Sequence, residues 1–250
     1  MNRHPMNDYQ PPANLLRDRI ILITGASGAV GSACAKACAA HGATVVLVDR
    51  KQAVLERVYD EIVNAGHPQP MLCPMDFERM RPADFETIAG GLETELGRLD
   101  GLLHAAGILG TLTPIEHYDM ELWFKVMQVN FNAPLLLTRA CLPLLKKSAD
   151  ASIVFSADRA GRRGRAYWGA YGVSHAACEN LAEILADELE ANTAIRVNTL
   201  DTGPVHGRLR TLAYPGEDPN SVPRAETLTA GFLYLLGPDS RGITGQSLDR

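Results

Sequence analysis

The sequence predicts an α/β fold in which a doubly wound, mostly parallel seven-stranded sheet is flanked by helices. Three observations support this. Short apolar runs alternate with helical patterns along the chain, a glycine-rich turn joins the first run to the first helix, and an acidic residue closes the second run. Strands that alternate with helices form a parallel sheet covered on both faces, with ligands at the carboxyl ends of the strands. We therefore expect a Rossmann fold.

The first strand, turn and helix carry the strongest signal. Residues 20–23 form an apolar run typical of a strand buried on both faces, and a helical pattern follows over 30–40. Between them lie Gly25, Gly28 and Gly31. Glycine lets the backbone approach a phosphate closely, and the N–H groups and dipole at a helix start favour its negative charge. A three-glycine turn also fits a plain structural turn, but the strand before it and the helix after it favour dinucleotide binding.

Asp49 ends the second predicted strand, residues 43–48, and lies eighteen residues after Gly31. A carboxylate at that offset can accept hydrogen bonds from an adenosine ribose, and it repels a 2′-phosphate. Arg50, the next residue, could stack on adenine or offer a positive charge. The charge argument favours NAD over NADP.

The remaining elements follow from spacing and from breaker residues. We expect helices over 52–65, 82–96, 119–146, 168–190 and 225–236, and strands over 71–75, 99–106, 152–157 and 195–200, with a short final strand after Gln246. Residues 158–165 are expected to form a loop and residues 206–223 a flexible flap. Pro134 has no N–H, so the carbonyl of Asn130 loses its helical partner and the helix should kink there. His104 is expected to be a packed residue of the fourth strand, because no second metal ligand lies at a useful spacing.

Composition limits the class of protein. The chain has 250 residues, which we assign to one domain over 16–250 after a flexible N-terminal arm over 1–15 that lacks the apolar segment of a secretory signal. A net charge of −5 argues against nucleic acid or a membrane surface as partner, and no apolar run approaches the length of a membrane span. Five cysteines without C-x-x-C spacing indicate reduced thiols and a cytoplasmic protein, with Cys34 and Cys38 in the core. No metal site is expected.

With these residues in view, the chain resembles the short-chain dehydrogenase/reductase family from about Leu16 to Asp249. The matching residues are Thr24-Gly25-Ala26-Ser27 and Gly31 in the turn, Asp76 after the third strand, Ala106-Gly107 after the fourth, Asn130, Tyr171 and Gly203. Residues 161–171 also resemble a bacterial subgroup typified by the YciK oxidoreductases.

The resemblance implies a nicotinamide cofactor across the strand ends and Tyr171 as general acid for carbonyl reduction, or base for alcohol oxidation. It implies a small-molecule substrate and a homodimer or homotetramer through the helices 119–146 and 168–190. In the family, the carbonyl of the residue matching Asn130 holds a water in a proton relay to a lysine. The implied cofactor-binding residues are Gly25, Ser27, Gly28, Val30, Gly31, Asp49, Arg50, Asp76, Phe77, Ala105, Ala106, Gly107, Tyr171, His175, Gly203 and Val205.

Several residues depart from the family pattern. The lysine position is His175, and the serine position, thirteen residues before Tyr171, is Asp158. Ala29 stands where the turn usually has a glycine. Ala105 replaces the asparagine of the family's Asn-Ala-Gly, and Asp201-Thr202-Gly203 stands at its Asn/Pro-Gly motif.

These departures have predictable signs. A carboxylate at position 158 holds the Tyr171 phenol protonated, and a histidine is only fractionally charged near neutrality, so oxidation should suffer more than reduction. Asp158 could hold His175 as an imidazolium. Alternatively, nearby arginines could neutralise Asp158, although a solvated basic loop is the simpler interpretation of these arginines. They are Arg159, Arg162, Arg163 and Arg165.

Three hypotheses for function remain open. The first is an NAD-dependent oxidoreductase acting on a carbonyl or secondary alcohol, with Tyr171 as proton donor and Asn130, His175 and Asp158 completing the catalytic group. The second is a silenced dinucleotide-binding pseudoenzyme with a regulatory or scaffolding role. The third is a protein that has lost cofactor binding as well. The side chains of residues 206–223 suggest no particular substrate.

Overall fold

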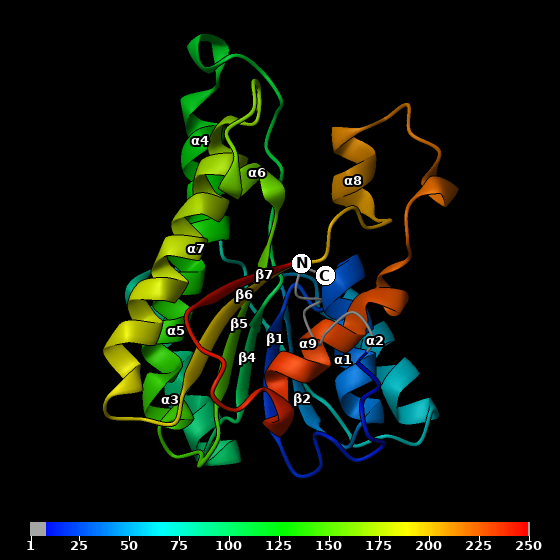
Figure 1. Cartoon of the computed structure of the whole chain (residues 1–250), viewed down its shortest axis with the longest axis vertical. Helices are drawn as coiled ribbons and strands as arrows, with labels where there is room; N and C mark the ends of the chain where they lie inside the picture. The colour runs from blue at the N-terminus through cyan, green and yellow to red at the C-terminus, as the bar shows by residue number, and fades with distance from the viewer. Residues whose placement is uncertain (1–8, 250) are drawn as a thin grey trace.

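The computed structural model describes residues 9–249. Its centre is a seven-stranded sheet with the order β3-β2-β1-β4-β5-β6-β7, in which every neighbouring pair is parallel. The predicted doubly wound fold is therefore confirmed, with a sheet that is wholly parallel (Figure 1). The strand order reverses between β1 and β4, and ligands bind at this reversal in open α/β sheets.

The strands are β1 (Ile20–Thr24), β2 (Thr44–Asp49), β3 (Met71–Pro74), β4 (Gly101–His104), β5 (Ser152–Ala157), β6 (Arg196–Asp201) and β7 (Gln246–Asp249). The α-helices are α1 (Ala29–Ala40), α2 (Gln52–Asn64), α3 (Pro82–Leu96), α4 (Met120–Met127), α5 (Ala133–Leu145), α6 (Arg159–Arg162), α7 (Gly169–Glu190), α8 (Arg208–Ala213) and α9 (Thr229–Leu236). A π-helical segment, η2 (Gln128–Asn132), joins α4 to α5, and short 3₁₀ turns are η1 (Ile115–His117), η3 (Pro219–Ser221), η4 (Ala225–Leu228) and η5 (Pro238–Ser240).

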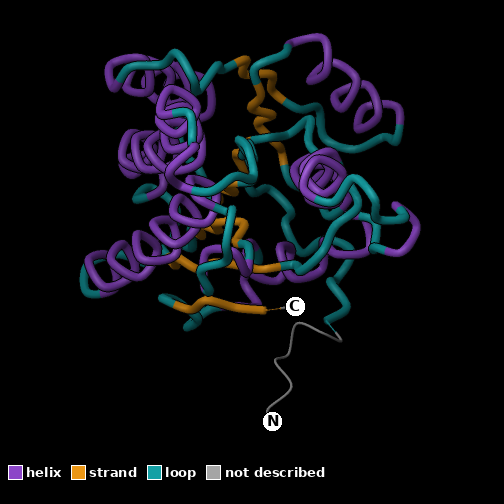
Figure 2. Tube along the Cα trace, turned by 90° about the horizontal axis from the view of Figure 1, so that it is seen from above, coloured by secondary structure: helices purple, strands orange, loops and turns teal. Residues whose placement is uncertain are grey.

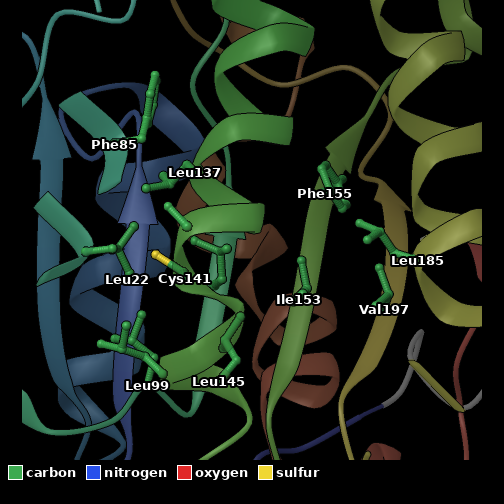
Figure 3. Close-up of a cluster of buried hydrophobic side chains, with 14 of the residues drawn as sticks. Leu22, Phe85, Leu99, Leu137, Cys141, Leu145, Ile153, Phe155, Leu185 and Val197 are labelled. Atoms are coloured by element: carbon green, nitrogen blue, oxygen red, sulfur yellow. The ribbon is translucent and has the colours of Figure 1, made fainter. Parts of the chain in front are cut away.

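Helices cover both faces of the sheet (Figure 2). Leu22 packs in the core beneath α3, α5 and α7, whereas its neighbours Ile21 and Ile23 pack in the core beneath α1, α2 and α9. This alternation is expected of a strand that is buried on both faces. Figure 3 shows side chains of the first core, among them Leu137 of α5 and Leu185 of α7.

Four predicted segments differ in the structure. The helix predicted over 119–146 is broken into α4, η2 and α5, with Pro134 in the first turn of α5, so the disturbance lies where the proline argument placed it. Residues 159–162 of the predicted loop form α6, which Asp158 caps by accepting a hydrogen bond from the Ala160 N–H at 2.8 Å. The predicted flap contains α8 and η3, and the helix predicted over 225–236 begins as the 3₁₀ turn η4.

The described part of the predicted N-terminal arm packs on the body of the fold. Leu15 is buried, and the Tyr9 hydroxyl donates a hydrogen bond to Asp239 at 2.7 Å while its ring contacts Tyr234. Residues 1–8 lie outside the described residues, and the domain boundary at residue 16 stays a prediction.

An ion-pair cluster lies at the amino ends of the strands, opposite the carboxyl ends where ligands bind. Asp150 accepts from Arg196 at 3.0 Å, from Arg19 at 3.2 Å and from Arg241 at 3.2 Å. Burial raises the pKa of Asp150, but attraction to Arg196 and Arg19 outweighs burial, so this pKa lies below its ordinary value.

We expect Asp150→Asn to lower the free energy of unfolding at pH 7 by about 3 kcal/mol, because it leaves the buried Arg196 without its counter-charge. A carboxyl whose pKa is lowered by folding contributes stability above its unfolded pKa, near 3.9, and loses it as the pH falls through the folded pKa. The difference from wild type should therefore shrink below about pH 4. Urea unfolding at pH 7 and below about pH 4 measures this difference in the free energy of unfolding, with the exposed Asp60→Asn as control. An equal loss of stability at the two pH values would contradict the explanation by charge.

Candidate active site

The turn between β1 and α1 is shaped for close approach of backbone to ligand. Gly25 has a φ of +65°, and a Cβ there would lie 2.7 Å from the carbonyl oxygen of Ala105. At Gly31 a Cβ would lie 2.1 Å from the Gly25 carbonyl oxygen. Gly28 is the N-cap of α1 and, being glycine, has no side-chain oxygen to bind the first N–H groups of the helix. The turn and the helix start therefore fit the pyrophosphate of a dinucleotide.

Asp49 lies beside this turn at the carboxyl end of β2. Its Oδ2 accepts hydrogen bonds from the Ser27 hydroxyl at 2.7 Å and the Ser27 N–H at 3.3 Å. The neighbouring Arg50 is exposed, and its guanidinium pairs with Glu78 at 3.4 Å. The structure thus brings the predicted acid and the predicted turn together, and their hydrogen bonds orient the carboxylate.

The ends of β3, β4 and β6 carry the other predicted cofactor positions. The Thr24 hydroxyl accepts from the N–H groups of Ala105 at 3.1 Å and Ala106 at 3.2 Å, which ties β1 to the segment after β4. The Phe77 ring stacks on Phe85 in the core. Asp76 pairs with Arg79 at 3.6 Å, and Gly107 lies beside Asn130. Gly203 donates its N–H to Asp201, and the side chains of Val30 and Val205 are half-buried.

Tyr171, Asp158 and His175 meet at the carboxyl end of β5. The Tyr171 hydroxyl donates to Asp158 Oδ2 at 3.2 Å, and the Tyr171 and His175 rings lie 4.4 Å apart, one turn along α7. Burial, reinforced by the charge of Asp158 and its hydrogen bond, raises the pKa of Tyr171 well above its usual value. The phenol therefore stays protonated near neutral pH, as predicted from the sequence.

The expectation that Asp158 holds His175 as an imidazolium is wrong. Burial lowers the pKa of His175 and outweighs the opposing attraction of Asp158, so the ring is neutral near pH 7. The alternative in which arginines neutralise Asp158 is not formed either, because no arginine among the described residues pairs with Asp158, and Arg163 and Arg165 are exposed as the simpler interpretation, a solvated basic loop, predicts. Arg159 pairs with Asp201 at 3.6 Å, and Arg162 pairs with Glu179 at 2.6 Å and with Asp249.

Asn130 lies in the π-helical segment η2 and is buried. Its side chain accepts from the Ile108 N–H at 2.9 Å and donates to the Ile108 carbonyl at 2.9 Å and to Ser174 at 3.2 Å. The backbone carbonyl of Asn130, predicted to be free for another donor, accepts from the Cys178 thiol at 3.1 Å. In this chain a thiol therefore donates to the carbonyl for which the resemblance implies a water, and the carbonyl oxygen keeps a second lone pair.

The flap contacts the site through aromatic side chains. The Tyr214 ring lies 6.0 Å from Trp168, whose ring lies 5.6 Å from Tyr171. Arg210 stacks on Tyr214 at 3.8 Å from the ring centroid. Trp168 and Tyr214 were not predicted from the sequence as neighbours of the site. The three-residue spacing of Trp168 from Tyr171, which puts both on one helix face, was a usable signal for Trp168.

His104 is buried, as predicted. It shares a hydrogen bond of 2.8 Å with the Thr138 hydroxyl and stacks on Phe155, and burial lowers its pKa to about 3. Across residues 9–249, no cluster of histidine, cysteine and acidic side chains is arranged to hold a metal ion. No helix in the same range has the length and hydropathy of a membrane span.

The known proteins that this chain resembles are short-chain dehydrogenases and a related oxidoreductase. The family model described as short chain dehydrogenase matches residues 19–217. The uncharacterized oxidoreductase YciK of Escherichia coli K12 is 40% identical over 241 residues, which cover 96% of this chain and 95% of the relative. A candidate short chain dehydrogenase from Pseudomonas syringae superimposes with a TM-score of 0.95 at 49% identity, covering 97% of this chain and 98% of that one. Another, from Escherichia coli CFT073 and complexed with NADPH, has a TM-score of 0.93 at 40% identity, covering 96% and 99%.

Proposed function

The chain belongs to the short-chain dehydrogenase family, and on that premise we propose that it is a nicotinamide-dependent oxidoreductase with Tyr171 as proton donor. When bound, the cofactor exchanges hydride with a carbonyl or secondary alcohol. The observation that carries the proposal is the position of the Tyr171 hydroxyl, which donates to Asp158 at 3.2 Å and lies at the carboxyl ends of the strands, where the glycine turn also lies.

The roles of the other residues follow from their contacts. Reduction of a carbonyl develops an alkoxide, which a positioned proton donor must neutralise. Tyr171 serves as that donor, whereas its raised pKa leaves little tyrosinate near neutral pH to act as base for alcohol oxidation. Asn130 fixes the segment after β4 through its two hydrogen bonds to Ile108, and the neutral His175 ring supports the phenol by packing. We therefore expect reduction to be the favoured direction.

Two measurements test this proposal. Calorimetry with NADH should give a dissociation constant well below millimolar, and a panel of ketones should be reduced in the presence of the bound cofactor. Affinity no better than millimolar would show that cofactor binding has been lost and would overturn the proposal.

For the cofactor, we propose NAD. The Escherichia coli CFT073 neighbour is complexed with NADPH, but Asp49 of this chain ends β2, and a carboxylate at that strand end repels a 2′-phosphate in Rossmann folds. NADH should bind at least about fivefold more tightly than NADPH, because repulsion of about 1 kcal/mol applies even in a fully hydrated site. Asp49→Asn should reduce this preference, and the exposed Asp60→Asn should not. Tighter binding of NADPH by the wild type would contradict the charge argument.

A pseudoenzyme is the second candidate, favoured by the neutral His175 at the lysine position and by Asp158 at the serine position. The double variant Asp158→Ser/His175→Lys separates the two, because it restores a cation and removes a carboxylate beside Tyr171. If the wild type is silent, we expect the double variant to gain ketone reductase activity. Loss of an existing wild-type activity in the double variant would refute the pseudoenzyme.

A homodimer or homotetramer through α4, α5 and α7 is also proposed. Phe124 and Ile184 leave 65% and 48% of their surface exposed on these helices, whereas Leu137 and Leu185 are buried in the chain's own core. The exposed pair supports an interface on these helices, and sedimentation of wild type and Phe124→Asp measures it.

A further inference from the structure

The space beside Tyr171 carries uncompensated negative charge. Asp158 Oδ1 caps α6 through the Ala160 N–H, and Oδ2 accepts from Tyr171. Across the part of the chain that the structure describes, no lysine, arginine or histidine nitrogen pairs with Asp158, although Arg159 and Arg162 lie within four residues of it. Each carboxylate oxygen still has room for a further donor, because an ionised carboxyl has about four acceptor sites.

A second carboxylate lies on the neighbouring strand. Ala157 of β5 is in register with Asp201 of β6, so Asp158 follows directly after the position paired with Asp201. Asp201 is only 3% exposed; its Oδ1 accepts from the Gly203 N–H at 2.7 Å, and its buried Oδ2 has no hydrogen-bond partner among the described residues. Its ion pair with Arg159 is long, at 3.6 Å, and the Arg159 side chain is 75% exposed to water.

The charged and titratable groups around the Tyr171 hydroxyl therefore sum to negative. Asp158 and Asp201 both act on Tyr171, and His175 is neutral. Arg159 offsets Asp201 across 3.6 Å, and Arg162 is shared by Glu179 and Asp249, so two arginines face four carboxylates. Such a site disfavours an acceptor that turns negative during reduction, because a developing alkoxide would lie beside a carboxylate. It favours an acceptor that carries a positive charge before reduction and loses it afterwards.

We propose that the preferred hydride acceptor is a protonated carbon–nitrogen double bond, an iminium, held by Asp158 with Asp201 behind it. This goes beyond the carbonyl activity proposed above and rests on the same site. The imine nitrogen is protonated first. A hydride from the reduced nicotinamide then bonds to the imine carbon while the C=N π pair becomes the nitrogen lone pair. One imine, one NADH and one proton thus give one amine and one NAD⁺.

Asp158 has a definite task in this scheme. Its Oδ2 accepts an N–H from the iminium, which keeps the nitrogen protonated and the carbon electrophilic. Tyr171, protonated and bound to the same carboxylate oxygen, orients Asp158 and closes the site on the side of α7. The serine that the family carries at this position has no charge with which to hold a cation.

Binding to the complex with NAD⁺ gives the first test, independent of turnover. Calorimetry compares pyrrolidinium and tetrahydroisoquinolinium with their neutral ring counterparts, cyclopentanol and tetralol. We expect the cations to bind at least about tenfold more tightly, since a hydrogen bond to a charged group exceeds a neutral one by about that factor. Asp158→Asn should abolish the difference, because asparagine keeps the shape and caps a helix as well as aspartate does. The exposed Asp187→Asn on α7 should preserve it.

Turnover of matched probes gives the second test. Pyrroline and dihydroisoquinoline should be reduced faster than cyclopentanone and tetralone. Asp158→Asn should lower the ratio of the imine rate to the ketone rate by about tenfold, whereas the exposed Asp187→Asn should leave both rates unchanged. Equal binding of cations and alcohols, or a preference that survives Asp158→Asn, would overturn the inference. Ketone reduction without imine reduction would overturn it and leave the proposed function intact. Failure to reduce either class while NADH binds would overturn both.

Discussion

Replacing Tyr171 with phenylalanine should lower the rate of ketone reduction by about 10²- to 10⁴-fold, the range that a positioned acid–base group contributes. The substitution removes only the hydroxyl, which donates to Asp158 at 3.2 Å. The ring keeps its contacts with Trp168 and His175, so the melting temperature should change little.

Stopped-flow measurement of cofactor oxidation checks this result, with Tyr167→Phe as the matched control. Tyr167 is 57% exposed and lies four residues from Tyr171, so its hydroxyl should be dispensable. A fall of less than about tenfold in Tyr171→Phe would show that the proton comes from another group, since general acid catalysis contributes at least about 10²-fold.

The substitution Gly31→Ala should be the most damaging single-methyl change in the cofactor turn. The added Cβ would lie 2.1 Å from the Gly25 carbonyl oxygen, closer than any van der Waals contact allows. That oxygen belongs to the backbone, so it cannot rotate away as a flexible side chain would. Overpacking of this kind costs about 1–3 kcal/mol of stability. Because the clash forces α1 away from the turn, NADH affinity should be lost as well.

Gly90→Ala is the matched control for this prediction. Gly90 lies within α3, and a Cβ there has open space around it. The same chemical change should therefore stabilise the protein by about 0.5–1 kcal/mol, since alanine loses less backbone entropy in a helix than glycine does. Urea unfolding and calorimetry with NADH measure both variants. Unchanged cofactor affinity in Gly31→Ala would contradict the tight-turn argument.

The parts of the fold that could be predicted are those written in local pattern. The buried strand before Gly25, the acid at the end of β2 and the disturbance near Pro134 each follow from a few neighbouring residues, and the structure contains all three. The proximity of Asp158 to Tyr171 was implied by the resemblance to the family, whose serine position Asp158 occupies, and the structure contains this contact.

The partners of individual charges could not be predicted, because they depend on contacts between distant segments. Arg162 is taken by Glu179 of α7 and by Asp249 of β7, eighty-seven residues away. The protonation of His175 is decided by burial, which no local pattern reports. The Cys178 thiol meets the Asn130 carbonyl only because α7 packs across η2.

That thiol contact ties the site to the packing of α7 against η2. Cys178 is buried, and its thiol donates to the Asn130 carbonyl at 3.1 Å, while the Asn130 side chain holds Ile108 in the segment after β4. A smaller side chain at position 178 would remove the donor and leave the volume of the sulfur unfilled, so its effect would reach that segment through Asn130.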